Sequence, residues 1–226
     1  RSPGEFYQLD MEMAFAGQED VFAVLEDVLP PIFAKYGKYN TASTAPFRRI
    51  PYLEAMEKYG TDKPDLRIDL TVQDLTQLLS GCGFPPFENQ RVKAVVVYGF
   101  EGSRKQIDKL CADVEVQTGN KVYWFRYDEK GELVGGISKF LQPIKDLVVE
   151  ALTLAPGCLV GLSAGTLLAA QKTAGVFIKT VAPLCPAHFV KERYEFCWIV
   201  DFPMYEIGEE SGELEFCHNP FSMPNG

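Results

Sequence analysis

The sequence has 226 residues, 46% of them hydrophobic and 23% charged, which is enough to bury the core of one large domain or two small ones. Its formal net charge of −9 argues against the chain being the main contact of a nucleic acid, which would need a basic face. No apolar run approaches the roughly 18 residues that span a bilayer, and no apolar signal region follows the first residues. Six scattered cysteines without a Cys-x-x-Cys pair favour a reducing cytoplasm over disulfides or a zinc site.

The first predicted element is a strand over residues 5–15, EFYQLDMEMAF, in which apolar and polar side chains alternate. A period of two is typical of a strand with one buried face. The apolar face consists of Tyr7, Leu9, Met11 and Met13, and the polar face of Gln8, Asp10 and Glu12. The polar row is either a solvated face or the floor of a cleft in which carboxylates bind an ammonium group or a magnesium ion.

Two helices are predicted next along the chain. Residues 17–33 carry two acidic residues at their start, which suits the positive end of a helix. We expect Pro30 and Pro31 to end or kink this helix. A second helix over residues 52–59 lies between a proline and Gly60, the usual residues at the start and just past the end of a helix.

The pattern changes near residue 70. Thr71 and Asp74 resemble a capping box that opens a helix, and short strands and helices then alternate as far as about residue 186. The strands are predicted over 92–99, 121–127 and 158–162, and the helices over 103–113, 143–154 and 165–175. This alternation indicates a compact α+β module.

Strand patterns return after residue 186. The segments FCWIVDFPMYEI and GELEFCHNPF flank an acidic turn and predict a hairpin. Because strand patterns at both ends enclose a different module, we expect an insertion. Residues 1–69 and 187–226 would belong to one domain, and residues 70–186 would form the inserted one.

Residues 161–165, GLSAG, have the spelling of a hydrolase nucleophile elbow with Ser163 as the nucleophile. The chain has only two histidines, and too few strands precede Ser163 for the doubly wound hydrolase sheet. We therefore favour a structural role, in which the two glycines allow a tight turn and close packing of a helix on a sheet. The hydrolase stays a remote alternative.

Two further segments carry candidate chemistry. The loop YGTDKPDLR, residues 59–67, places four charges around one proline, and it is either a solvated turn or part of a site. His218 and Asn219 follow the last predicted strand, where an imidazole and an amide are suited to hold a carboxylate or phosphate.

Taken in order, the motifs EFYQLDMEMAF, YGTDKPDLR, WIVDFPMYE and HNPFSMP resemble the catalytic domain of the bacterial-type aspartyl-tRNA synthetases, a class II family. The block between them, which contains SRKQID and GISKFL, resembles the GAD insertion domain of that family. The resemblance covers essentially the whole chain. It implies an α+β fold in which antiparallel-sheet segments of a class II synthetase flank an inserted, GAD-like α+β domain.

The resemblance also implies a reaction in two steps, with ATP and Mg²⁺ as cofactors. The carboxylate of L-aspartate attacks the α-phosphorus of ATP, and the terminal ribose hydroxyl of tRNA then takes the aspartyl group. No covalent enzyme intermediate is needed, since catalysis depends on positioning and electrostatic stabilisation. The family further implies a cytoplasmic homodimer without a membrane segment.

The resemblance assigns roles residue by residue. Gln8, Asp10 and His218 would bind the substrate aspartate, with Asp10 paired to its ammonium group. The supporting residues would be Asp62, Lys63, Arg67, Glu12 and Asn219, the last standing where many bacterial relatives have a second histidine. No catalytic side chain and no metal ligand is assigned.

Motif 1, the first part of motif 2 and motif 3 of class II synthetases are not found in the sequence. We therefore expect these 226 residues alone to be inactive in aspartate-dependent pyrophosphate exchange. An alternative from another class is a non-catalytic module that faces tRNA, with Lys93, Arg104 and Lys105 as a local basic patch.

Overall fold

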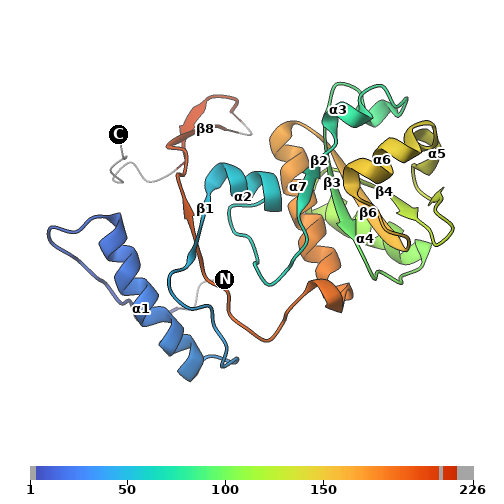
Figure 1. The fold of residues 1–226 in the computed structure, drawn as a ribbon. Helices are drawn as coiled ribbons and strands as arrows, with labels where there is room; N and C mark the ends of the chain where they lie inside the picture. Colours follow the sequence, from blue (N-terminus) through green and yellow to red (C-terminus); the bar gives the residue numbers. More distant parts are fainter. Residues whose placement is uncertain (1–3, 209–210, 218–226) are drawn as a thin grey trace. The chain divides into compact units, whose positions relative to one another are not determined.

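The computed structural model describes residues 4–208 and 211–217 (Figure 1). The chain forms two compact units. The first consists of Arg1–Arg48 and Glu192–Phe196, and the second of Arg49–Lys191 and Cys197–Gly226. Among the described residues, none of the helices combines the length and the apolar character needed to cross a membrane.

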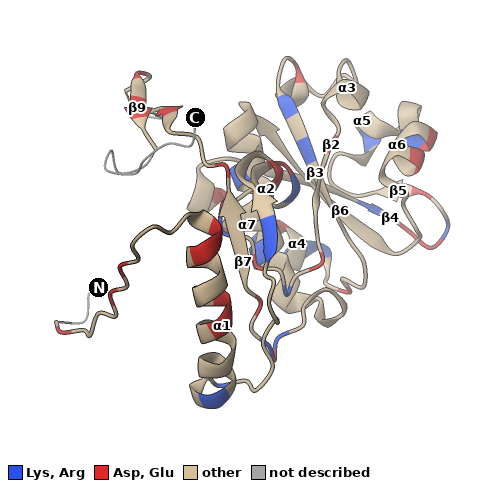
Figure 2. Ribbon diagram, turned by 60° about the vertical axis from the view of Figure 1, so that its left-hand side comes forward, with Lys and Arg blue, Asp and Glu red and all other residues tan. Residues whose placement is uncertain are grey.

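The first unit contains helix α1 (Gln18–Tyr36), which begins where the backbone N–H of Gly17 donates to the Asp20 carboxylate at 2.8 Å. Acidic residues lie along the first half of this helix, and Lys35 lies in its last turn (Figure 2). Pro30 and Pro31 do not end the helix as one form of the prediction had it, because α1 continues through both. The ring of Phe33 in the next turn packs edge-on against Tyr194 and Phe196, and this packing outweighs the local preference of proline.

The predicted strand over residues 5–15 is also wrong. The structure has no strand in this segment, and the side chains of both predicted faces are exposed, Leu9 by 89%. An alternating pattern becomes a half-buried strand only where a second strand pairs with it and a core covers its apolar face. Among the described residues, the segment has neither.

The second unit is built on a five-stranded antiparallel sheet with the strand order β2-β3-β6-β4-β5. The strands are β2 (Val72–Asp74), β3 (Arg91–Val97), β4 (Val122–Tyr127), β5 (Leu133–Val134) and β6 (Cys158–Gly165). The central strands β3 and β6 are buried on both faces because helices cover each side of the sheet. The mixed, antiparallel fold confirms the predicted α+β class.

Each face of the sheet has its own helices (Figure 1). Helices α4 (Arg104–Thr118) and α7 (Leu167–Val181) pack on one face, around Val95, Leu159 and Phe177. The other face is covered by α3 (Thr76–Leu79), α5 (Ser138–Leu141) and α6 (Lys145–Leu152). Short 3₁₀ helices occupy Pro85–Phe87, Gln142–Ile144, Ala182–Leu184 and Pro186–His188.

The remaining elements of the second unit lie on either side of this module in sequence. Strand β1 (Arg48–Pro51) leads into helix α2 (Tyr52–Tyr59) and pairs with β7 (Cys197–Val200). Strands β8 (Tyr205–Ile207) and β9 (Leu214–Phe216) form the predicted hairpin. Helix α2 has the bounds that its flanking proline and glycine predict.

The first helix of the module does not begin at the predicted capping box of Thr71 and Asp74. Residues 72–74 form a strand paired with β3, and the helix begins only at Thr76. Asp74 still caps this helix, since its carboxylate accepts the backbone N–H of Thr76 at 2.8 Å. The burial of both Val72 and Leu75 is therefore explained by a strand that turns directly into a helix.

Candidate functional site

The polar row of the N-terminal segment lies in the first unit. The side-chain amide of Gln8 donates to the carboxylate of Asp10 at 2.5 Å, and Glu12 is exposed like both of them. The contact between Gln8 and Asp10 shows that these two side chains share one side of an extended backbone. All three side chains of the row are open to solvent.

The charged loop that follows α2 is ordered by contacts of its own. The Asp65 carboxylate accepts two hydrogen bonds from the guanidinium of Arg67, at 2.8 and 2.7 Å. These hydrogen bonds lower the pKa of Asp65. Arg67 also lies over the ring of Phe189 at 5.1 Å, and Lys63 pairs with Asp62. Arg67 therefore braces the loop, while Lys63 stays largely exposed to solvent.

The structure brings Asp62 of this loop near three groups that the sequence did not single out. They are Tyr52 at the start of α2, Glu206 of β8 and Cys217 after β9. Burial and the charge of Glu206 raise the pKa of the Cys217 thiol, which also shares a hydrogen bond with Glu206. Burial raises the pKa of the Tyr52 hydroxyl, and electrostatic interaction with Cys217 and Glu206 raises it further. This cluster contains two carboxylates, Asp62 and Glu206, of which Asp62 is also paired with Lys63.

The predicted residues His218 and Asn219 follow Cys217 directly in the sequence and lie outside the described residues. Glu206 and Cys217 were not predicted individually, although Glu206 falls within the motif WIVDFPMYE and Cys217 within the predicted strand segment GELEFCHNPF. Tyr52 carried no signal beyond its place at the start of a helix. Its contact with Phe202, with ring centroids 4.9 Å apart, could not be seen from the sequence.

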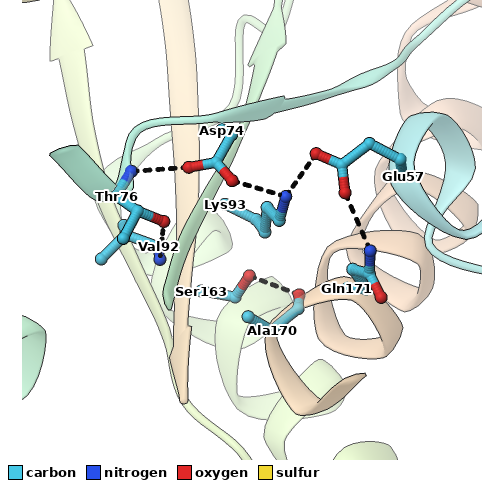
Figure 3. A network of polar contacts seen from close by, with 8 residues as sticks. All are labelled: Glu57, Asp74, Thr76, Val92, Lys93, Ser163, Ala170 and Gln171. Atoms are coloured by element: carbon cyan, nitrogen blue, oxygen red, sulfur yellow. Dashed lines mark hydrogen bonds and ion pairs between the residues drawn. The ribbon is translucent and has the colours of Figure 1, made fainter. Parts of the chain in front are cut away.

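Ser163 is a structural residue of strand β6. It is buried within the strand, opposite Lys93 of β3, and its hydroxyl donates to the carbonyl oxygen of Ala170 at 2.7 Å (Figure 3). Both ring nitrogens of His188 are engaged, Nδ1 with Asp69 at 2.6 Å and Nε2 with the backbone N–H of Tyr98 at 3.0 Å. The geometry therefore argues against the hydrolase alternative.

We expect Ser163 to remain unlabelled by a fluorophosphonate probe, because its hydroxyl is buried and already donates to a backbone carbonyl. Ser163→Ala should lower the free energy of unfolding by about 1 kcal/mol, the usual contribution of one hydrogen bond. Mass spectrometry after labelling and urea denaturation measure the two effects. Labelling of the wild-type chain that the Ala variant abolishes would restore the hydrolase interpretation.

Lys93 does not belong to the predicted basic patch. Lys93 is 1% exposed and forms ion pairs with Glu57 and Asp74, so its charge cannot face a nucleic acid. Arg104 and Lys105 are exposed at the start of α4, and Arg104 lies 3.7 Å from Asp108. A tRNA contact at these two residues stays a prediction.

Comparison with known proteins confirms the resemblance to class II tRNA synthetases. The family model described as tRNA synthetases class II (D, K and N) matches residues 1–226. The aspartate–tRNA ligase of Streptomyces coelicolor is 44% identical over 229 residues, which cover all of this chain and 38% of that protein. The aspartate–tRNA(Asp/Asn) ligases of Rickettsia bellii and Paramagnetospirillum magneticum are each 40% identical over the whole chain, which covers 38% and 26% of them.

The chain thus spans less than two-fifths of the length of these curated relatives. Both the family model and these relatives match the whole of this chain, from its first residue to its last. The chain belongs to the class II tRNA synthetases of the D, K and N group.

Proposed function

We propose that this chain contributes to an aspartate–tRNA ligase, which joins L-aspartate to ATP as aspartyl-adenylate and passes the aspartyl group to tRNA. One observation carries the proposal: the relatives named above are aspartate ligases and match the chain over all its residues at 40–44% identity. We further propose that the ligase is a cytoplasmic homodimer.

The substrate would be held by its charges. We propose that Asp10 pairs with the ammonium group of aspartate and that Gln8 and His218 complete the contacts. The hydrogen bond between Gln8 and Asp10 supports this assignment, because the amide fixes one carboxylate oxygen and leaves the other for the substrate. Asp62, Lys63 and Arg67 would support the site through the loop, and Glu12 and Asn219 through their neighbours.

In the described part of the chain, no group of three or more His, Cys, Asp or Glu side chains is arranged to hold an ion. We therefore propose that Mg²⁺ enters with the phosphates of ATP, which are its usual partners. No step of the reaction is assigned to a side-chain-bound metal among these residues.

Calorimetric titration of the 226-residue chain with aspartate, in the presence of ATP and Mg²⁺, tests the aspartate pocket. We expect Asp10→Ala to abolish the heat of aspartate binding, because the ammonium group loses its counter-charge. Glu5→Ala, which removes a charge from the same exposed segment, should leave binding unchanged. Asparagine and lysine should give no heat, and equal binding of all three amino acids would contradict the proposal.

Pyrophosphate exchange tests the whole reaction. The native protein in which these residues occur should exchange pyrophosphate into ATP only when aspartate is present. These 226 residues alone are expected to be inactive, since they span only 38% of the length of relatives with the full activity in their names. Exchange that depends on lysine or asparagine would overturn the assignment to aspartate.

A further inference from the structure

The side chain of Lys93 is buried completely in the second unit, and Figure 3 shows the carboxylates of Asp74 and Glu57 that face its ammonium. It stands on the central strand β3, opposite Asp74 of β2 on one side and Ser163 of β6 on the other. A buried ammonium carries a large desolvation cost unless it is paired and hydrogen-bonded. Its partners therefore indicate what the charge achieves in this position.

Lys93 joins two elements that are not neighbours in the sequence. Its ammonium lies 2.8 Å from the Asp74 carboxylate, on the adjacent strand, and 2.5 Å from the Glu57 carboxylate, on helix α2. The second oxygen of Glu57 accepts a hydrogen bond from the amide of Gln171 on α7 at 2.9 Å. Glu57 thus attaches α2 both to the sheet and to the helix that covers it.

The C-terminal end of α2 is held at the same place by backbone contact. A Cβ atom on Gly60 would lie 2.1 Å from the carbonyl oxygen of Gln171. A Cβ atom on Gly175 would lie 2.7 Å from the carbonyl oxygens of Tyr59 and Gly60. Such a close approach of two backbones leaves α2 little freedom to slide along α7.

Both ends of α2 lead to the acidic cluster described above. Tyr52 is the first residue of the helix, and Asp62 lies two residues beyond Gly60. A change in the position of α2 would therefore move both groups relative to Glu206 and Cys217. The ion pair of Glu57 with Lys93 lies between these ends, in the second half of the helix.

We propose that Lys93 is a positioning residue, which acts through Glu57 to hold α2 and the loop 60–67 in the geometry of the candidate site. The sheet module thereby sets the position of residues that precede it in the chain. The part of this proposal that concerns the substrate rests on the proposed ligase function. The part that concerns α2 rests on the contacts alone.

Two matched variants separate positioning from general stability. Glu57→Gln and Asp74→Asn each remove one carboxylate from the same ammonium and leave the other in place, but only Glu57 belongs to α2. We expect Glu57→Gln to accelerate hydrogen–deuterium exchange in residues 52–67 by roughly tenfold and to leave α4 unchanged. Asp74→Asn should affect β2 and α3 instead. Equal exchange in residues 52–67 of both variants, or a uniform rise across the unit, would overturn the proposal.

A kinetic measurement extends the test to the reaction. In the longest native chain that carries these residues, Glu57→Gln should raise the KM for aspartate several-fold while the KM for ATP stays constant, and Asp74→Asn should change neither. Unchanged exchange rates in residues 52–67 would refute the positioning role even where aspartate-dependent activity is found. Local acceleration in a protein without aspartate-dependent activity would refute the ligase function and leave the positioning of α2 intact.

Discussion

Replacing Gly60 with alanine is expected to lower the free energy of unfolding by about 3 kcal/mol. Gly60 has a φ of 64°, a left-handed conformation that costs a residue with a Cβ atom roughly 1–2 kcal/mol. The new Cβ would also meet the backbone of α7, at 2.1 Å from the Gln171 oxygen and 2.7 Å from the Gly175 nitrogen. Neither atom can give way without moving a helix, and such overpacking costs a further 1–3 kcal/mol or so.

Gly119 offers a matched control for this substitution. It follows α4 with a φ of 69°, close to that of Gly60, but a Cβ atom there would meet nothing within 4 Å. Gly119→Ala should therefore lose only the cost of the left-handed backbone, roughly 1–2 kcal/mol. Urea denaturation of the two variants measures the difference. Equal losses would show that α2 and α7 separate easily at Gly60, against the close approach seen in the structure.

The sheet module was the most predictable part of the fold. The apolar runs around β3 and β4 and the periodic pattern of α4 are local signals, and the three predicted strands formed within about three residues of their predicted bounds. Helices α4, α6 and α7 begin within two residues of their predicted starts, but α4 and α7 continue five or six residues past their predicted ends, and β2, β5 and α5 were not predicted. Helix α2 was predicted because Pro51 and Gly60 fix its ends through backbone conformation alone. Each of these elements is specified by residues that are neighbours in the sequence.

The predictions that were wrong concern segments whose structure depends on residues distant in the sequence. The segment 5–15 has the alternation of a strand, but a strand needs a partner, and alternation alone does not supply one. Helix α1 passes through two prolines because Phe33 packs on aromatic rings about 160 residues further along the chain. Lys93 was placed in a basic patch because its two carboxylate partners, Glu57 and Asp74, are distant from it in the sequence.

The candidate site also combines a residue that a local sequence pattern predicts with residues that only the fold brings together. Asp62 was selected because its loop concentrates charges, and the structure places it beside Glu206 and Cys217. These two residues and Tyr52 reach the cluster through the packing of α2 and the hairpin, which no sequence pattern describes. The assignments of Asp10 and His218 came from the family resemblance and stay predictions.

The stability that Asp74 contributes through its contact with Lys93 is expected to depend on pH in the acidic range. Partial burial opposes ionisation of this carboxyl, but hydrogen bonds from Lys93 and Thr76 and the charge of Lys93 lower its pKa to about 2. Because this value lies below the ordinary 3.8, the contribution of Asp74 to stability is complete above pH 3.8 and disappears as the pH falls towards 2. The stability difference between wild type and Asp74→Asn should shrink over the same range. Asp74 is partly exposed, so screening limits the difference to about 1 kcal/mol.

The double variant Glu57→Gln/Asp74→Asn is expected to lose about 3 kcal/mol of unfolding free energy, more than the sum of its single variants. Each single change leaves one carboxylate on Lys93 and should cost about 1 kcal/mol, whereas the double change leaves a buried ammonium without a counter-charge. The expected loss is at the lower end of the range for such a charge because both carboxylates are partly exposed, which lets water approach.

Adding Lys93→Met to the double variant should recover most of the loss, since an apolar side chain of similar length needs no counter-charge. Glu54→Gln, on the same helix and paired with exposed Lys58, should cost no more than about 0.5 kcal/mol. Urea denaturation at pH 7 provides all five values. Strictly additive single variants, or no recovery with Lys93→Met, would mean that water already compensates the Lys93 charge, and the packing of α2, including the contact between Gly60 and Gly175, would then hold the helix without a contribution from the ion pair.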